Sequence, residues 1–401
     1  MRMTGSTRSA ASGSVIEVFV AFLKLGLTAF GGPIAHLGYF RDEFVDRRGW
    51  IDDRGYAELI GLCQFLPGPA SSQAGFAIGI MRAGPLGGLA AWCGFTLPSA
   101  LIMMLFASVS ASMDGPAGRA AIHGLKLVAV AIVAQALWGM ARTLTPDARR
   151  IAIATLAGLL VMLVGNAWAQ ISAILFGMAA GMLLCRSTAT PHISLGRFGI
   201  SRRAALACLI LATSMLGALP ILAGVSDWRP LQLFDLFYRA GALVFGGGHV
   251  VLPLLREGLV PDWISQNAFL SGYGAAQALP GPLFAISAYL GVAADGFRGA
   301  MIALAAIFMP GLLLVSGALP FWARLAANPR ATAVVAGANA AVVGILAAAL
   351  YDPLWTAGVE TWLDSILVLL GFIALVRWRL PPLLAVIAFV LIAIISRAWS
   401  V

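Results

Sequence analysis

The chain repeats one short pattern of turn-forming residues inside strongly apolar sequence. A Phe-Gly-Gly turn starts at Phe30 and again at Phe245, and a Pro-Gly-Pro triplet starts at Pro67 and again at Pro280. The offset between copies is 215 residues at the first motif and 213 at the second, so order and spacing are kept apart from a two-residue deletion. Proline removes a backbone donor and clashes with the preceding turn, so a helix cannot pass through the triplet. A duplicated break within apolar segments predicts a membrane transporter whose binding site lies at the breaks.

Composition makes the lipid bilayer the solvent for most of the chain. Of the 401 residues, 60% are hydrophobic and 11% are charged, against about 25% charged in a soluble protein. A crossing helix takes roughly 20 apolar residues, and about thirteen such segments fit in the chain. The net charge of +9 is typical of basic residues that flank membrane helices, so we expect no nucleic-acid partner. The four cysteines and four histidines show no metal-binding or catalytic spacing, so we expect no metal, no cofactor and no enzyme.

The apolar segments form two sets of six around one unpaired segment. We divide the chain into a polar N-terminal tail (1–13), a first transmembrane repeat (14–186), a basic linker with one extra transmembrane helix (187–226) and a second transmembrane repeat (227–401). Six crossings plus one reverse the side from which the second half enters the bilayer. The predicted fold is therefore an all-α polytopic bundle of two inverted repeats, each with a helix broken at Pro-Gly-Pro. If each broken segment is instead a re-entrant hairpin that never crosses, the halves are parallel, and this alternative stays open.

Basic residues predict a cytoplasmic N-terminus, because cytoplasmic loops carry the excess of Lys and Arg. The loops assigned to the opposite side, near 165–166 and 352–360, hold no Lys or Arg. The loop 33–52 is an exception: it would also lie outside, yet it holds three arginines, whose charge is offset by neighbouring acids. The loops assigned to the cytoplasm hold Arg142, Arg149, Arg150, Arg186, Arg197, Arg202, Arg203, Arg330, Arg377 and Arg379.

Lysine is rare in the chain and lies inside apolar segments. Its two lysines are Lys24, which matches Arg239 in the second copy, and Lys126, which matches Asn339. A cation at the centre of a membrane helix costs about 2.5–3.5 kcal/mol, so it is usually kept for function or paired with an acid. Snorkelling of Lys24 to a headgroup is the structural alternative. We expect these four residues to bind the substrate.

The two breaks predict an anion-binding region. The helix that resumes after each break points its N-terminal amides and the positive end of its dipole into the gap, and glycine allows a close approach to the backbone. We expect substrate contacts from Gln64, Gly68, Ser71 and Ser72 in the first copy and from Gln277, Gly281 and, one turn along, Ser287 in the second.

We assign gating or structural roles to the turns, the flanking prolines and two pairs of adjacent opposite charges. The histidines near the turns fit local hydrogen bonding better than a proton switch. No acidic residue is duplicated in the apolar interior, which weighs against coupling to protons or sodium. The residues in these roles are Gly31, Gly32, His36, Arg41, Asp42, Pro67 and Pro69 in the first half and Gly246, Gly247, His249, Arg256, Glu257, Pro280 and Pro282 in the second.

The chain resembles the long, two-domain members of the chromate transporter family. The resemblance covers nearly the whole chain, and the combination of motifs is specific although each is short. The first-half motifs are Phe30 to Pro33 with His36, Arg41 to Phe44, Gln64 to Pro69 and Gly84 to Gly88, and the second-half motifs are Phe245 to His249, Gln277 to Pro282 and Gly337 to Gly344.

The resemblance implies a bacterial inner-membrane protein that exports chromate, with sulfate as the related oxyanion. We expect export driven by the membrane potential, which gives chromate resistance, and we keep a sulfate or oxyanion importer or exchanger as the alternative. An intramembrane enzyme would need clustered acids or histidines at membrane depth, which the sequence does not show. Assembly into a homo-oligomer stays open.

Overall fold

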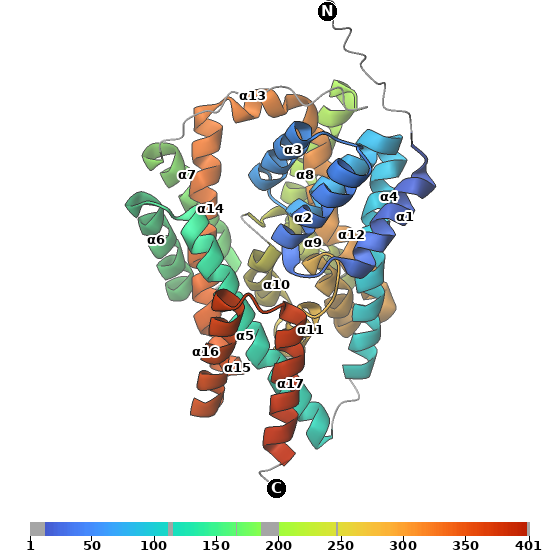
Figure 1. Cartoon of the computed structure of the whole chain (residues 1–401). Helices are drawn as coiled ribbons and strands as arrows, with labels where there is room; N and C mark the ends of the chain where they lie inside the picture. The colour runs from blue at the N-terminus through green and yellow to red at the C-terminus, as the bar shows by residue number, and fades with distance from the viewer. Residues whose placement is uncertain (1–12, 111–114, 166, 186–199, 246–247, 399–401) are drawn as a thin grey trace, which may run out of the picture.

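The computed structural model describes residues 13–110, 115–165, 167–185, 200–245 and 248–398, and it contains only helices, turns and loops in these ranges (Figure 1). The α-helices are α1 (Val15–Thr28), α2 (Gly32–Arg41), α3 (Asp53–Phe65), α4 (Ala70–Ser110), α5 (Pro116–Leu144), α6 (Ala148–Val164), α7 (Ala167–Leu184), α8 (Arg202–Gly224), α9 (Arg229–Ala242), α10 (Val251–Leu259), α11 (Gln266–Ala276), α12 (Ile286–Ala318), α13 (Trp322–Ala326), α14 (Pro329–Ala349), α15 (Thr356–Gly358), α16 (Trp362–Arg377) and α17 (Pro382–Ala398). The predicted all-α polytopic bundle is confirmed.

Helix α4 is two antiparallel arms joined by a tight turn at Ala83 and Gly84. Gly84 has φ +67°, outside the helical region. Gly79 and Gly87 lie eight residues apart, which is about 12 Å in a straight helix, yet a Cβ on either glycine would overlap the carbonyl oxygen of the other. The chain therefore folds back on itself at this turn.

Helix α12 repeats this hairpin in the second half. The turn lies at Asp295 and Gly296, where Gly296 has φ +61°. Gly291 and Gly299 approach each other as the glycines of α4 do. The same hairpin therefore occurs in both halves.

Fewer helices than expected are long enough to cross a bilayer. The helices α1 and α9 have 14 residues each, or about 21 Å, which is short of a hydrocarbon core of about 30 Å. The sequence predicts about thirteen apolar segments, and Ala169–Leu184 and Pro382–Ser396 are apolar helices too short to count as full spans. Among the described residues, the five stretches long and apolar enough to cross are Ala70–Ser110, Pro116–Leu144, Arg202–Gly224, Leu283–Ala326 and Pro329–Gly358.

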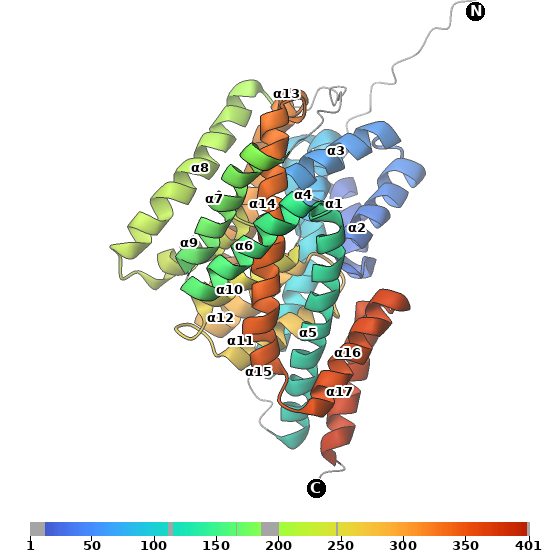
Figure 2. The same ribbon diagram turned by 90° about the vertical axis from the view of Figure 1, so that its left-hand side faces the viewer.

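The two halves exchange packing partners. In the first half, α5 packs against α16 and α17 of the second half, and α14 of the second half packs against α6 and α7 of the first (Figure 2). Glycines let the backbones touch: a Cβ on Gly158 or Gly177 would meet the backbone of α14, and one on Gly124 would meet that of α17. The halves are therefore interleaved rather than set side by side.

Equivalent connections lie at opposite ends of the molecule. The end of α4 and the start of α5 lie at the lower end in both views, whereas α13, which connects α12 to α14, lies at the upper end, as does the start of α1 (Figures 1 and 2). The unpaired helix α8 separates the two halves in sequence and packs against α9 and α12.

Candidate anion-transport site

Each Pro-Gly-Pro break is hydrogen-bonded to the other half of the chain. The Gly68 N–H donates to the Val244 carbonyl at 2.7 Å, just after α9, and the Gly281 N–H donates to the Ala29 carbonyl at 2.9 Å, just after α1. Ala29 and Val244 are separated by the same 215 residues as the Phe-Gly-Gly turns that follow them. The two contacts are therefore equivalent, and each break meets the first-helix end of the opposite half.

Only glycine fits at the centre of each break. Gly68 has φ +120° and Gly281 has φ +94°, a region that residues with a side chain rarely adopt. A Cβ on Gly68 would lie 3.0 Å from the Gly311 Cα of α12, and one on Gly281 would lie 2.8 Å from the Ser99 Oγ of α4. The long helix of each half therefore passes directly across the break of the other half.

Gln73 hydrogen-bonds the backbone at the first break, a role that was not predicted from the sequence. Its side-chain amide, fully buried, donates to the Pro67 carbonyl at 2.9 Å and to the Gly311 carbonyl at 3.1 Å. These bonds satisfy a carbonyl that the interrupted helix leaves free. The signal was a glutamine in the apolar run after the break. A comparison of the two copies misses it because Ile286 takes the matching place.

Several predicted polar side chains near the breaks keep unsatisfied atoms. The hydroxyls of Ser72 and Ser287 and the Gln277 amide nitrogen are buried without a hydrogen-bond partner in the described structure. Ser71 is also buried, whereas Gln64 is exposed. Buried polar groups are almost always paired, so unpaired donors beside both breaks are groups that a ligand with oxygen atoms can satisfy.

Lys24 lies at the surface of α1 and pairs with a buried acid. Its Nζ is 3.4 Å from Glu43 Oε2, and the side chains are 51% and 7% exposed. Glu43 also accepts hydrogen bonds from Arg47 at 3.1 Å and Arg48 at 2.7 Å. Burial alone would raise the pKa of the Glu43 carboxyl, but the hydrogen bond from Arg48 and the positive charges around it hold that pKa below its usual value.

Arg239 pairs with an acid and lines a cavity. Its guanidinium binds Asp235, one turn earlier on α9, with contacts down to 2.6 Å. It also lines a cavity of about 70 Å³ together with Gln170 of α7 and Glu257 of α10. That volume is enough for about two water molecules at the density of the liquid. Glu257 of the second half matches Asp42 of the first half, which is next to Glu43. The cation of the first helix, Lys24 or Arg239, therefore lies near the same acidic segment in each half.

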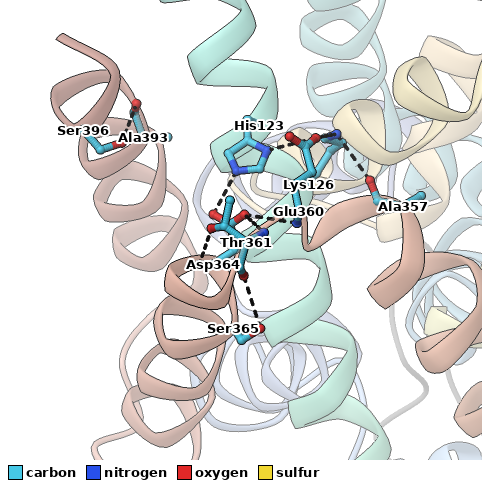
Figure 3. Close-up of polar contacts among 9 residues, drawn as sticks. All are labelled: His123, Lys126, Ala357, Glu360, Thr361, Asp364, Ser365, Ala393 and Ser396. Atoms are coloured by element: carbon cyan, nitrogen blue, oxygen red, sulfur yellow. Dashed lines mark hydrogen bonds and ion pairs between the residues drawn. The ribbon is translucent and has the colours of Figure 1, made fainter. Parts of the chain in front are cut away.

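Lys126 belongs to a separate polar cluster (Figure 3). Its Nζ lies 3.0 Å from Glu360 Oε1, 3.3 Å from the Ala357 carbonyl and 3.4 Å from Asn267 Oδ1. The hydrogen bond from Lys126 lowers the pKa of the Glu360 carboxyl. On α14, the matching Asn339 keeps a buried Oδ1 without a partner in the described structure.

The residues assigned to gating have mixed surroundings. Gly31 and Gly32 have φ of +100° and +81°, whereas Gly246 and Gly247 lie outside the described residues. Arg41 does not pair with its neighbour Asp42; it binds Asp53 at 2.6 Å and Asp46 at 3.0 Å.

The two histidines near the turns differ. His36 is buried with its ring against Phe95, and His249 Nδ1 lies 2.6 Å from the Tyr273 hydroxyl. In the second half, Arg256 binds the Gln266 side chain at 3.2 Å. His249 therefore makes a local hydrogen bond, whereas both ring nitrogens of His36 are buried without a hydrogen-bond partner in the described structure.

The long apolar helices define a multi-pass helical membrane protein. The chain belongs to the chromate transporter family, because the model of that family, described as "Chromate transporter", matches residues 16–183 and again residues 231–395. This is a family of transporters and not of enzymes. Its description gives chromate as the transported anion. The two matches fall on the two predicted repeats.

Curated relatives are similar over most of the chain. A "Probable chromate transport protein" of Synechococcus elongatus is 29% identical over 381 residues, covering 92% of each chain. A "Chromate transport protein" of Pseudomonas aeruginosa is 29% identical over 342 residues, covering 84% of this chain and 80% of that one. An "Uncharacterized transporter" of Bacillus subtilis, YwrA, is 31% identical over 167 residues, which are 39% of this chain but 92% of YwrA. No solved structure matches.

Proposed function

We propose that this protein exports chromate from the cytoplasm through the region around the two breaks, and that it thereby gives chromate resistance. The reciprocal bonds of Gly68 to Val244 and of Gly281 to Ala29 carry the proposal, because each joins the break of one half to the end of the first helix of the other half. Interrupted helices that meet between repeats are the usual substrate site of such transporters. Membership of the chromate transporter family supplies the anion.

We also propose that the halves are inverted repeats with the N-terminus in the cytoplasm, in a bacterial inner membrane. The exchanged packing of α5 and α14 and the placement of equivalent connections at opposite ends support the inversion (Figures 1 and 2). The arginine-rich loops support the orientation. The half-length YwrA supports the division at 14–186 and 227–401, with 187–226 as the linker and 1–13 as the tail.

Lys24 and Arg239 are the proposed cations of the anion path. In the described state Glu43 and Asp235 hold them, so an entering dianion exchanges with a carboxylate instead of meeting a bare charge. Ser72, Ser287 and Gln277 then supply neutral donors. Partial neutralisation of this kind lets the anion leave as well as enter, as transport requires.

The membrane potential is sufficient to drive export. The cell interior is negative, and two charges that cross 100 mV gain about 4.6 kcal/mol. That free energy corresponds to a concentration ratio on the order of a thousandfold. Export of a dianion therefore needs no ATP.

Everted membrane vesicles test this function. With an interior-positive potential, they are expected to accumulate labelled chromate, and collapse of the potential is expected to abolish accumulation. Uptake that persists after collapse rejects the electrogenic mechanism. Unlabelled sulfate distinguishes the alternative: if sulfate is accumulated and chromate is not, or if flux runs inward in intact cells, the protein is a sulfate importer or exchanger.

Charge removal tests the proposed site. We expect Lys24→Ala and Arg239→Ala each to reduce chromate flux at least tenfold, because a lost contact to an ionised group is worth about 1.5–3 kcal/mol. Normal flux through both variants, at normal membrane levels, would exclude these residues from the path. Arg149→Ala, at the cytoplasmic end of α6, is the matched control and is expected to transport normally.

A further inference from the structure

The first half returns twice to the end of the molecule at which it starts. Arg82, at the close of the first arm of α4, binds Glu17 at the start of α1, with 3.1 Å between Nη2 and Oε2. Its carbonyl accepts the Gly13 N–H at 3.0 Å. Its guanidinium lies 5.1 Å from the centre of the Trp50 ring, in the segment between α2 and α3. The start of α1, this segment and the turn of α4 therefore lie together.

The second half makes the same return. Trp263 takes the place of Trp50, 213 residues later in the chain. Arg229, at the start of α9, lies over the Trp263 ring, with its Cζ 4.1 Å from the ring centre, a favourable cation–π distance. Trp263 lies between α10 and α11. After two helices, the chain is therefore back at the end where the first of them begins.

The helices that make these returns are too short to cross a bilayer. Helices α1, α2 and α3 have 14, 10 and 13 residues, or about 15–21 Å, against a hydrocarbon core of about 30 Å. Their counterparts α9, α10 and α11 have 14, 9 and 11 residues. The far end of α1, at Ala29, meets Gly281, and the far end of α3 leads to Gly68, which meets Val244. Each pair of short helices thus reaches the breaks and turns back.

The two sets of short helices come from opposite ends of the molecule. Helices α1–α3 lie in the upper part of both views, and α10 and α11 lie in the lower part (Figures 1 and 2). Helix α8 connects the two ends. Near its start, Ala205 and Leu209 pack against Gly317 at the end of α12, beside α13 at the upper end. Its 23 residues, about 35 Å, then carry the chain down to the start of α9.

We propose that Lys24 and Arg239 belong to two oxyanion-binding sites that open to opposite faces of the membrane, the Lys24 site to the cytoplasm and the Arg239 site to the outside. The side chain of Lys24 is 51% exposed, on a helix pair that enters from the N-terminal end and returns to it. Arg47 and Arg48, on the returning segment, meet Lys24 at the shared Glu43 carboxylate. Three cations around one carboxylate leave two positive charges, which match a dianion.

The Arg239 site is reached from the other end. Arg239 lines its cavity with Glu257 of α10, on the helix pair that enters from the lower end. A dianion leaving the cell therefore binds at Lys24 before it reaches the breaks and at Arg239 after it has passed them. This order rests on the proposed function of export.

The returning helices remove the exception among the basic loops. If α1 crossed the membrane, Arg41, Arg47 and Arg48 would lie outside; on a pair that returns, they lie in the cytoplasm with the other basic loops. The halves also stay inverted although the broken segment does not cross. Neither α1 nor the broken segment adds a crossing, so the second arm of α4, α5, α6 and α7 leave an even number before α8.

Cysteine labelling tests the two faces without transport. In a background without the four native cysteines, Asp46→Cys and Asp262→Cys place thiols on exposed positions of the two returning segments. An impermeant maleimide applied to spheroplasts is expected to label Asp262→Cys and not Asp46→Cys, and everted vesicles are expected to give the reverse. Arg330→Cys, exposed at the start of α14, is the control and is expected to react from the same face as Asp46→Cys. Labelling of these two from opposite faces, or of both from the outside, overturns the proposal.

The wild-type protein tests the cytoplasmic site directly. The chain has two lysines, and the side chain of Lys24 is 51% exposed whereas that of Lys126 is 7% exposed. An impermeant amine-reactive ester is expected to modify Lys24 in everted vesicles and not in spheroplasts, as read by mass spectrometry. Chromate on the cytoplasmic face is expected to slow this modification about threefold at about twice its Kd, because the bound anion covers the amine. Chloride at equal ionic strength is the control for screening.

The outcomes separate the site from the function. Modification of Lys24 from the outside, or a rate that chromate changes no more than chloride does, overturns the Lys24 site. Protection of Lys24 by chromate in vesicles that show no chromate flux overturns the proposed export and leaves the binding site standing.

Discussion

Glu43 is a buried carboxylate of the first half that pairs with three cations. It is buried and contacts Lys24, Arg47 and Arg48, so its loss leaves three cations without their shared partner. Breaking a buried pair costs about 3–5 kcal/mol, whereas exposed pairs are worth under about 1 kcal/mol. Because these cations are partly exposed, the cost here lies between the two limits.

We predict that Glu43→Gln lowers the free energy of unfolding by about 1–2 kcal/mol at pH 7. The pKa of Glu43 is lowered in the folded protein, so the wild type has this stabilisation above the ordinary carboxyl pKa and loses it as the pH falls through the folded value. The melting-temperature difference from Glu43→Gln should therefore be smaller at a pH below the ordinary carboxyl pKa than at pH 7. Asp46→Asn, an exposed partner of Arg41, is the control and should shift little. An equal difference at both pH values would contradict this account.

At the residue scale, the sequence identified the two lysines better than their partners. The rarity of lysine in apolar runs singles out Lys24 and Lys126, and the structure gives each an acidic partner. Glu43 and Glu360 could not be found in advance because they lie 19 and 234 residues from their partners. Such a pairing depends on how helices meet and leaves no local pattern.

At the scale of elements, the backbone of each break packs closely against the opposite half of the chain. We predict that Gly68→Ala and Gly281→Ala each destabilise the protein by about 2–4 kcal/mol, from left-handed strain and overlap with the opposite helix. Chromate flux should fall with them. Gly139→Ala, on α5 with open space around its Cα, should change stability by no more than about 1 kcal/mol. Melting temperature and vesicle uptake measure both effects; wild-type behaviour of Gly68→Ala would show that the break tolerates a side chain.

The hairpins of α4 and α12 show what local sequence can and cannot specify. Each hairpin turns at a glycine with positive φ, Gly84 or Gly296, and glycine is a residue type that local sequence identifies as able to adopt such a turn. Helices α1 and α9 end at Thr28 and Ala242, just before the Phe-Gly-Gly turns. The exchange of α5 and α14 between halves was invisible, since it rests on contacts far apart in sequence.

At the scale of the whole molecule, the proposed inverted arrangement predicts opposite exposure of equivalent positions. Leu86 and Arg298 follow the turns of α4 and α12 at matching places and are both exposed. In a background without the four native cysteines, an impermeant maleimide applied to the outer face of spheroplasts should label Arg298→Cys and not Leu86→Cys. Everted vesicles should give the reverse. Labelling of both from one face would mean that the halves are parallel.

The central claim is that the protein carries chromate across the membrane together with its negative charge. Proteoliposomes of the purified protein, loaded with chromate and placed in chromate-free buffer of equal ionic strength, test this with a potential-sensitive dye. The account predicts an interior that becomes positive as the dianion leaves, and no signal from protein-free liposomes. Loss of chromate without a change in potential, or a potential change with no loss of chromate, would contradict it.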